Sequence, residues 1–327
     1  MPGSHGGDAE DPLHPDLREQ LRARREELRE EISHAKEHFE EANEKIKART
    51  GRDLIVAILI GLALGAMLVS SLAFEKWVFV PIAIAIVLLS TYEIARALRQ
   101  AGRRIDIVPQ LLGALLLAIS ASLADWWLSW VVLFAVIFVI IVWRMVGQMI
   151  AADGRTYGNV LADVLISAFV PAYVPFLASL TIVLVRQDGG QWWLLGFIIV
   201  VVAADTSAYV VGMLLGKHAM APRISPNKTW EGFAGAVVGS CVAATLVAVY
   251  MLQLPVWTGP ILGLTILGTA TLGDLAESML KRDLGVKDMS SWLPGHGGLL
   301  DRIDSILPSA AAAICLYVIL SPLASAA

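Results

Sequence analysis

Nine long apolar segments, separated by short polar loops, constrain this 327-residue chain more than any other feature of its sequence. A helix that crosses the roughly 30 Å hydrocarbon core needs about 20 apolar residues, which is close to the length of these segments. Backbone in lipid must satisfy its own hydrogen bonds, and the segments are too long for barrel strands. With 57% hydrophobic and 17% charged residues, the sequence predicts an all-α, polytopic membrane bundle of about nine transmembrane helices. The segments are 54–74, 77–95, 107–124, 126–146, 160–185, 191–216, 230–253, 256–280 and 299–323.

The N-terminal part of the chain is polar and precedes all of these segments. Residues 1–15, rich in glycine, proline and histidine, are expected to be disordered. Residues 16–53 are expected to form one amphipathic helix with a narrow, heptad-like apolar stripe. Two interpretations of this helix stay open: a coiled coil that pairs two copies into a homodimer, and a solvated helix beside the membrane. Beyond it, we expect N-terminal transmembrane helices over 54–185 and a C-terminal region over 186–327 that carries the polar motifs.

Basic residues in the short loops predict how the chain is oriented in the membrane. The loops after the second, fourth, sixth and eighth segments carry most of the lysines and arginines, whereas the alternate loops hold only Lys76 and Arg186. We therefore expect the basic loops and the N-terminal helix in the cytoplasm and the C-terminus outside. Every polar cluster would then face the compartment that contains nucleotides.

Four carboxylates occur as two pairs at the ends of the eighth and ninth segments. Asp274 and Glu277 are three residues apart on one helix face, and Asp301 and Asp304 repeat that spacing. One loop joins the two helix ends, so the pairs can converge. Such oxygen ligands suit Mg²⁺, and Asp274, Asp301 and Asp304 are the candidate metal ligands. The alternative is a network of ion pairs between these carboxylates and the cations Lys281, Arg282 and Arg302.

The loop between these two helices carries the most specific motif in the chain. Residues 278–304 read SMLKRDLGVKDMSSWLPGHGGLLDRID. This stretch resembles the signature of the phosphatidate cytidylyltransferase (CDP-diacylglycerol synthase) family and fills it without a gap. The matching positions are Ser278, Lys281, Arg282, Lys287, Asp288, Ser290, Leu293, Pro294, His296, Gly297, Gly298, Asp301, Arg302 and Asp304.

The glycines of this signature also suggest a phosphate site on physical grounds. Gly297 and Gly298 have no Cβ, so their backbone can approach a phosphate closely just before a helix, whose positive end favours anions. His296 could bond a phosphate oxygen or a carboxylate, or could simply fill the loop.

A second polar block lies upstream of the signature. Asp205 interrupts the sixth segment near its middle, where an ionisable group is by default functional or paired. Thr229 is expected to cap the seventh helix, with Lys228 at its positive end, an arrangement suited to phosphate. The block resembles a second motif of the same family, although Asn227 stands where members commonly have another lysine. The resemblance covers the chain from Asp205 onward. The first four segments resemble the family only in being apolar membrane segments.

The resemblance implies that CTP and phosphatidic acid give CDP-diacylglycerol and pyrophosphate, with Mg²⁺ as cofactor and a second cation as a further candidate. It implies a multi-pass enzyme of a bacterial-type plasma (inner) membrane, with its active site facing the cytoplasm. Its partners would be CTP, phosphatidic acid and membrane lipid, and we expect no nucleic acid. The implied catalytic residues are Lys281, Arg282, Asp301, Arg302 and Asp304. The implied substrate-binding residues are Asp205, Ser225, Lys228, Thr229, His296, Gly297 and Gly298.

Two rival functions are compatible with a helical membrane bundle. An anion transporter could also carry intramembrane carboxylates, but here the charges gather at one face and no two halves show matching interrupted helices. Another CTP-using membrane enzyme, such as a polyprenol or phytol kinase, would transfer the γ-phosphoryl group and release CDP. The nucleotide product therefore separates this second rival from the predicted enzyme.

Overall fold

The computed structural model describes Arg24 and residues 54–151, 156–286, 288–290 and 297–324. The chain divides into two compact units, Met1–Ile60 and Gly61–Ala327, and the fold described here is that of the second unit. The predicted disordered segment and the predicted helix at 16–53 lie outside the described residues, apart from Arg24, which is helical and exposed. The homodimer therefore stays a prediction.

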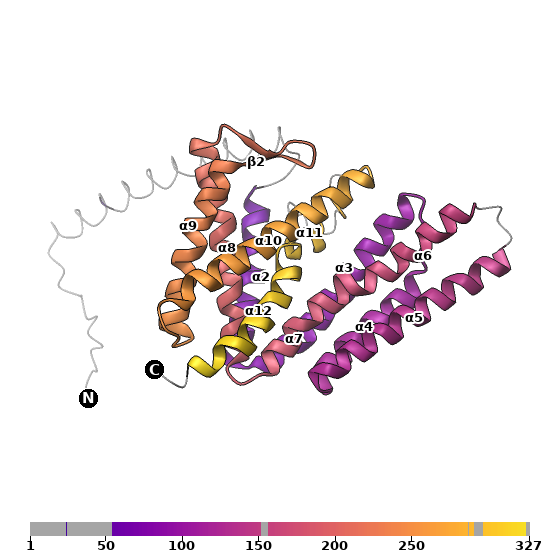
Figure 1. Cartoon of the computed structure of the whole chain (residues 1–327), viewed down its shortest axis with the longest axis horizontal. Coiled ribbons are helices and arrows are strands. Elements are labelled where there is room, and N and C mark those ends of the chain that lie inside the picture. Colours follow the sequence, from indigo (N-terminus) through magenta and orange to yellow (C-terminus); the bar gives the residue numbers. More distant parts are fainter. Residues whose placement is uncertain (1–23, 25–53, 152–155, 287, 291–296, 325–327) are drawn as a thin grey trace, which may run out of the picture. The chain divides into compact units, whose positions relative to one another are not determined.

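Each of the nine predicted apolar segments lies in a helix or in a run of consecutive helical turns (Figure 1). Among the described residues, seven of these runs are long and apolar enough to cross a membrane, whereas α4 and the Gly65–Phe74 part of α2 are shorter. The polytopic helical fold is thus confirmed, and the count of nine crossings stays a prediction. The elements are α2 (Leu54–Phe74), α3 (Lys76–Gln100), α4 (Ile107–Leu123), α5 (Trp126–Ala151), α6 (Tyr157–Pro171), η1 (Ala172–Phe176), α7 (Leu177–Arg186), α8 (Gly190–Leu215), β1 (Ala219–Ala221), β2 (Ser225–Thr229), α9 (Trp230–Leu246), η2 (Val247–Met251), α10 (Thr258–Asp283), α11 (Leu300–Ile303), α12 (Ile306–Leu320) and η3 (Ser321–Leu323).

The run from α6 through η1 to α7 is the central element of the bundle. Its apolar stretch is 72% buried, and α7 contacts α3 and α4 on one side and α8 and α12 on the other. Pro171 and Pro175 lack the N–H that would continue the helical hydrogen-bond ladder. The wider π-helical turn at η1 occurs where these prolines fall, as such turns often accommodate a break in the ladder.

Small residues let α8 and α9 lie closely side by side (Figure 1). A Cβ at Gly232 of α9 would meet the Ala208 carbonyl oxygen at 2.8 Å and the Gly212 Cα of α8 at 3.2 Å. Glycine at this crossing is therefore needed for the two backbones to approach, a common device in membrane helix pairs.

A two-stranded antiparallel hairpin joins α8 to α9 and was not predicted from the sequence. Ala219 of β1 lies opposite Thr229 of β2, and Ala221 lies opposite Ser225. The Glu231 carboxylate, at the start of α9, accepts the backbone N–H groups of Lys217 at 3.1 Å and His218 at 3.2 Å. These bonds fix the base of the hairpin to the start of α9.

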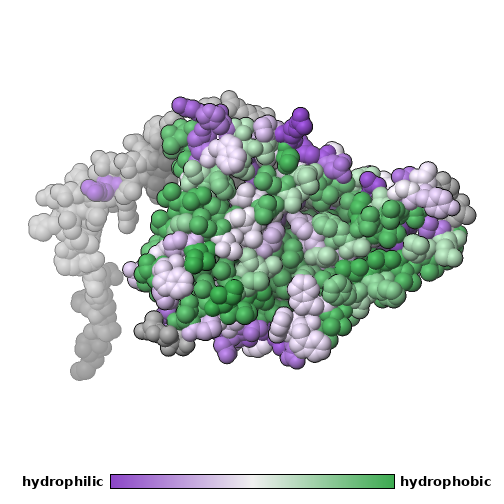
Figure 2. Space-filling model, in the orientation of Figure 1, coloured by the Kyte–Doolittle hydropathy of each residue, from purple (hydrophilic) through white to green (hydrophobic). Residues whose placement is uncertain are grey.

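The surface of the bundle is that of a membrane protein. Figure 2 shows apolar side chains over most of the visible face, with hydrophilic residues gathered toward its margins. On α5, large apolar side chains such as Phe134 and Phe138 are about two-thirds exposed, and only 22% of its apolar stretch is buried inside the protein. Lipid is the solvent that makes such exposure favourable.

Candidate functional site

A cavity of about 320 Å³ lies between α8, the hairpin, α9 and α10. Its polar lining brings together Asp205 of α8, Lys228 and Thr229 of β2, and Asp274 of α10. The Lys228 ammonium forms an ion pair with the Asp274 carboxylate. Residues of α8, β2 and α10 that were predicted to bind substrate or metal thus line one cavity.

The start of α9 and the hairpin hold Lys228 at the edge of this cavity. Thr229 caps α9 as predicted, because its hydroxyl accepts the N–H of Gly232 at 3.1 Å. Arg282, at the end of α10, donates from Nε to the carbonyl of Ile224 in the hairpin turn at 3.3 Å. Arg282 therefore contacts the loop that carries Lys228, and its predicted role at a phosphate stays a prediction.

A second polar cluster lies where α10 meets α11. The Lys281 ammonium contacts the Glu277 carboxylate at 2.9 Å and the Asp301 carboxylate at 3.0 Å. Both carboxylates are almost fully buried, and among the described residues the Oε1 atom of Glu277 has no hydrogen-bond partner. A buried carboxylate oxygen left without a donor is costly, so this oxygen remains available to a cation or a substrate hydrogen.

Asp301 also organises the glycine turn of the signature. Its Oδ2 atom accepts the N–H of Gly298 at 2.8 Å and that of Met289 at 3.1 Å. Gly297 adopts a positive φ of 80°, and a Cβ at Gly298 would meet Asp301 Oδ2 at 2.9 Å. The structure therefore requires glycine at both positions, the first for its backbone conformation and the second for space.

Glu93 on α3 is a further residue of the site that sequence reasoning missed. Its buried carboxylate accepts the N–H groups of Leu299 at 3.0 Å and Leu300 at 2.8 Å, and the Ser290 hydroxyl at 2.5 Å. These three donors belong to the signature on either side of its glycines. Glu93 thus anchors the signature loop to a helix about 200 residues away in the sequence; its position inside an apolar segment was the one signal available.

Asp304 lies between the two clusters at the start of the last helical run. Its Oδ1 atom accepts the backbone N–H of Ser305 at 2.6 Å, and its side chain is nearly buried. α10 lies close to Asp304: a Cβ added at Gly273 would be only 2.3 Å from the Asp304 carbonyl oxygen. Asp304 is close enough to Asp274 and Glu277 for their charges to interact, and Asp274 and Asp304 likewise act on Asp205.

The candidate metal ligands are therefore neighbours, but two of them are engaged with lysines. Asp274 is paired with Lys228 and Asp301 with Lys281. Within the part of the chain that the structure describes, no group of three His, Cys, Asp or Glu residues is arranged to hold a metal ion. Ion pairs are thus observed at these carboxylates, made by Lys228 and Lys281, and the metal site stays a prediction.

The other predicted site residues fall in different places. Arg302 is exposed, and Ser225 lies on β2 away from the cavity lining, whereas Asn227 contributes to that lining. His296 lies outside the described residues. Asp163 of α6 pairs with Arg144 of α5 at 3.5 Å and is not part of the cavity lining.

Comparison with known proteins finds a matching family model and several similar proteins. Residues 55–320 match the model of the Cytidylyltransferase family. The chain is 39% identical to a protein named phosphatidate cytidylyltransferase in Mycobacterium bovis, over 84% of this chain and 91% of that protein. A protein of the same name in Mycobacterium tuberculosis is also 39% identical, over 84% of this chain and 85% of its own. A protein of that name in Haemophilus influenzae is 46% identical over 36% of this chain and 42% of its own.

Proposed function

Because the chain belongs to the cytidylyltransferase family, we propose that it transfers CMP from CTP to phosphatidic acid, giving CDP-diacylglycerol and pyrophosphate. The observation that carries this proposal is the adjacency of two lysine–carboxylate clusters, one at Lys228–Asp274 and one at Lys281–Asp301, beside the glycine turn. The cavity of about 320 Å³ at the first cluster has the size of a small-molecule site.

The residues suit a reaction between two anions. A phosphate oxygen of phosphatidic acid attacks the α-phosphorus of CTP, a new P–O bond forms, and the bond to the bridging oxygen breaks as pyrophosphate leaves with its electron pair. The nucleophile is already an anionic oxygen, so the protein needs no activated serine or cysteine. Its task is to overcome repulsion and to stabilise charge on the leaving group.

We assign these tasks to the cations around the two clusters. Lys228 would hold a phosphate of the nucleotide together with the free N–H groups at the start of α9. Lys281 lies between two buried carboxylates and would exchange one of them for a phosphate oxygen. Arg302 would remain a phosphate clamp, and Arg282 would act through the hairpin that it contacts.

Mg²⁺ is the cofactor that fits this donor set. Asp274, Asp301 and Asp304 would hold it, and the unpartnered Oε1 atom of Glu277 gives a further oxygen nearby. When bound, the ion would neutralise charge on the pyrophosphate and orient the nucleotide.

One assay tests the proposed reaction. Purified protein in detergent would be incubated with phosphatidic acid and CTP labelled separately in the α-phosphate and the γ-phosphate. We expect the α-label in the lipid and the γ-label in pyrophosphate. Transfer of the γ-label to a lipid alcohol with release of CDP would identify a kinase instead, and no turnover with labelled anion flux in vesicles would favour a transporter.

We also propose that the clusters face the cytoplasm of a cell with this protein in its plasma membrane, as the loop charges predict. On a background that lacks Cys241 and Cys315, the variants Arg103→Cys, Asp288→Cys and Ala324→Cys report the three relevant positions. An impermeant maleimide added to intact cells should label only residue 324, and permeabilisation should expose the other two. Labelling of residue 288 in intact cells would contradict the orientation and the access to cytosolic CTP.

Lys228→Ala should raise the KM for CTP roughly tenfold and lower kcat by a similar factor, because a charge-assisted phosphate contact is lost. Lys228→Arg should be intermediate, since its planar fork keeps the charge but not the compact geometry. The KM for phosphatidic acid should change little. Steady-state kinetics with each substrate varied in turn measure all three quantities.

Lys217→Ala is the matched control, since Lys217 is an exposed cation just before β1, at the base of the same hairpin, and does not line the cavity. Its kinetics should resemble those of the unmodified protein. An unchanged dependence on CTP in folded Lys228→Ala would remove Lys228 from the nucleotide site and leave it only a role in membrane topology.

A further inference from the structure

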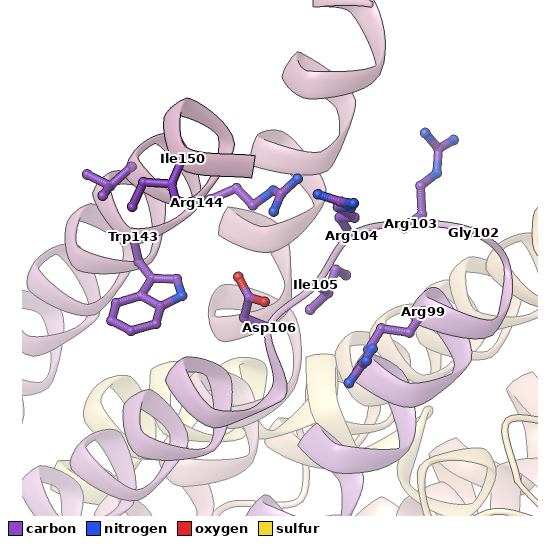
Figure 3. A pocket seen from close by; sticks show the side chains of 11 residues that line it. Arg99, Gly102, Arg103, Arg104, Ile105, Asp106, Trp143, Arg144 and Ile150 are labelled. Atoms are coloured by element: carbon purple, nitrogen blue, oxygen red, sulfur yellow. The ribbon is translucent and has the colours of Figure 1, made fainter. Parts of the chain in front are cut away.

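A second cavity, of about 810 Å³, lies away from both lysine clusters, where the loop between α3 and α4 approaches the end of α5. Four arginines line it: Arg99, Arg103, Arg104 and Arg144. Figure 3 shows the Arg104 and Arg144 guanidinium groups directed toward one another, and Asp106 is the one carboxylate among the lining residues that the structure describes. Nothing in the proposed reaction uses this cavity.

Arg144 is the buried centre of this group. It is 4% exposed, and its Nη2 atom contacts Asp163 at 3.5 Å and Gln148 Oε1 at 3.0 Å. The other oxygen of Asp163 accepts the backbone N–H of Arg104 at 3.3 Å, which brings the two arginines to opposite sides of one carboxylate. Among the described residues the Nε–H of Arg144 has no acceptor, but this atom is buried away from the open part of the cavity. Arg144 therefore forms one wall of the cavity, held in place by Asp163 and Gln148.

The described lining of the cavity is rich in positive charge. Among the described lining residues, four are arginines and one, Asp106, is a carboxylate. Among the described residues, Arg99 and Arg103 make no ion pair. An arginine cluster of this kind is suited to a phosphate, whose oxygens accept paired N–H bonds.

The apolar part of the cavity selects the kind of phosphate compound. Trp143, Val146 and Ile150 of α5 line it and are 57%, 47% and 78% exposed. These side chains continue the apolar outer face of α5, which would lie against acyl chains. A ligand with an anionic head and an apolar tail matches both parts, whereas inorganic phosphate or a free nucleotide would use only the arginines.

We propose that this cavity binds the phosphate head group of an anionic phospholipid, at a site separate from the lysine clusters. The head group lies against Arg99 and Arg103, and its acyl chains follow α5. Arg99 stands on α3 six residues after Glu93, about 9 Å along the helix, and Glu93 holds the signature loop. A bound head group would therefore restrict the motion of α3, the helix whose Glu93 holds the signature loop.

Phosphatidylglycerol is the suitable probe, because its phosphate is a diester and it is not the substrate proposed above. Native mass spectrometry would measure its binding to the purified full chain, with phosphatidylcholine, which is zwitterionic and has no net charge, as the comparison. The double variant Arg99→Gln/Arg103→Gln should weaken phosphatidylglycerol binding roughly tenfold, as expected for two surface arginines near a lipid charge. Arg99 and Arg103 are partly exposed, so the double variant should fold. Arg144→Gln is avoided, because it would leave Asp163 unpaired in the interior.

Arg96→Gln is the matched control, since Arg96 is an exposed arginine one turn from Arg99 and outside the cavity. It should bind phosphatidylglycerol like the unmodified chain. Equal binding by the double variant and the control would overturn the proposal and leave the arginines as topology-determining charges. Full competition by millimolar inorganic phosphate would also overturn it, in favour of a small-anion site. Because the readout is binding, neither result depends on the proposed reaction.

Discussion

Asp304→Asn should reduce turnover by about a thousand-fold while the protein remains folded and monodisperse. A loss of this size is expected when a group that helps to neutralise charge in the transition state is removed. The side-chain oxygen of the substituted asparagine can still accept the Ser305 N–H, so the local turn should persist. What is removed is a negative charge at the junction of the two clusters, close to Asp274 and Glu277. Turnover measured across a Mg²⁺ titration separates this effect from misfolding.

Asp283→Asn provides the control for this variant. Asp283 is the exposed last residue of α10, so it has the same chemistry without a place in either cluster. It should retain nearly full activity. Near-normal turnover of Asp304→Asn at limiting Mg²⁺ would show that the metal assignment is wrong.

Glu93→Ala should lower kcat by about a hundred-fold or more through the signature loop, although Glu93 touches no proposed substrate. Two backbone N–H groups and one hydroxyl lose their acceptor, at about 1–3 kcal/mol for each group that stays buried and unpaired. Glu93→Gln keeps one side-chain oxygen and should recover part of the activity. Hydrogen exchange at residues 297–301 should speed up in the same order as kcat falls.

Ser90→Ala is the control for Glu93, since Ser90 is buried one turn away on α3 and its hydroxyl has no partner. Its kinetics and its hydrogen exchange should be unchanged. If Glu93→Ala lost thermal stability but kept both kcat and slow exchange in the loop, Glu93 would be a packing residue only.

The helices could be predicted because lipid leaves few alternatives. A run such as 191–216 must be helical to satisfy its backbone, and the observed α8 (Gly190–Leu215) differs by one residue at each end. The cap at Thr229 followed from the chemistry of its hydroxyl. The hairpin was missed because strands of three and five residues have too short a pattern to show alternation.

The candidate site was predicted in its residue types better than in its partners. The spacing of Asp274 and Glu277 placed them on one face, but only the fold shows that Lys228 pairs with the first and Lys281 with the second. Glu93 could not be connected to the signature from the sequence, because its contacts are nearly 200 residues away. The contact of Arg282 Nε with the hairpin could not be foreseen from the signature, and the role of Arg282 at a phosphate stays a prediction.

The ion pair between Lys228 and Asp274 has a thermodynamic consequence for the order in which ligands occupy the cavity. A phosphate that takes the lysine leaves the carboxylate without its counter-ion, and a cation that takes the carboxylate leaves the lysine without its own. Each ligand therefore removes the competitor of the other, and the two must enhance each other's affinity by the same factor. An anion alone or a cation alone should thus bind weakly at this lysine–aspartate pair, and the two together should bind cooperatively.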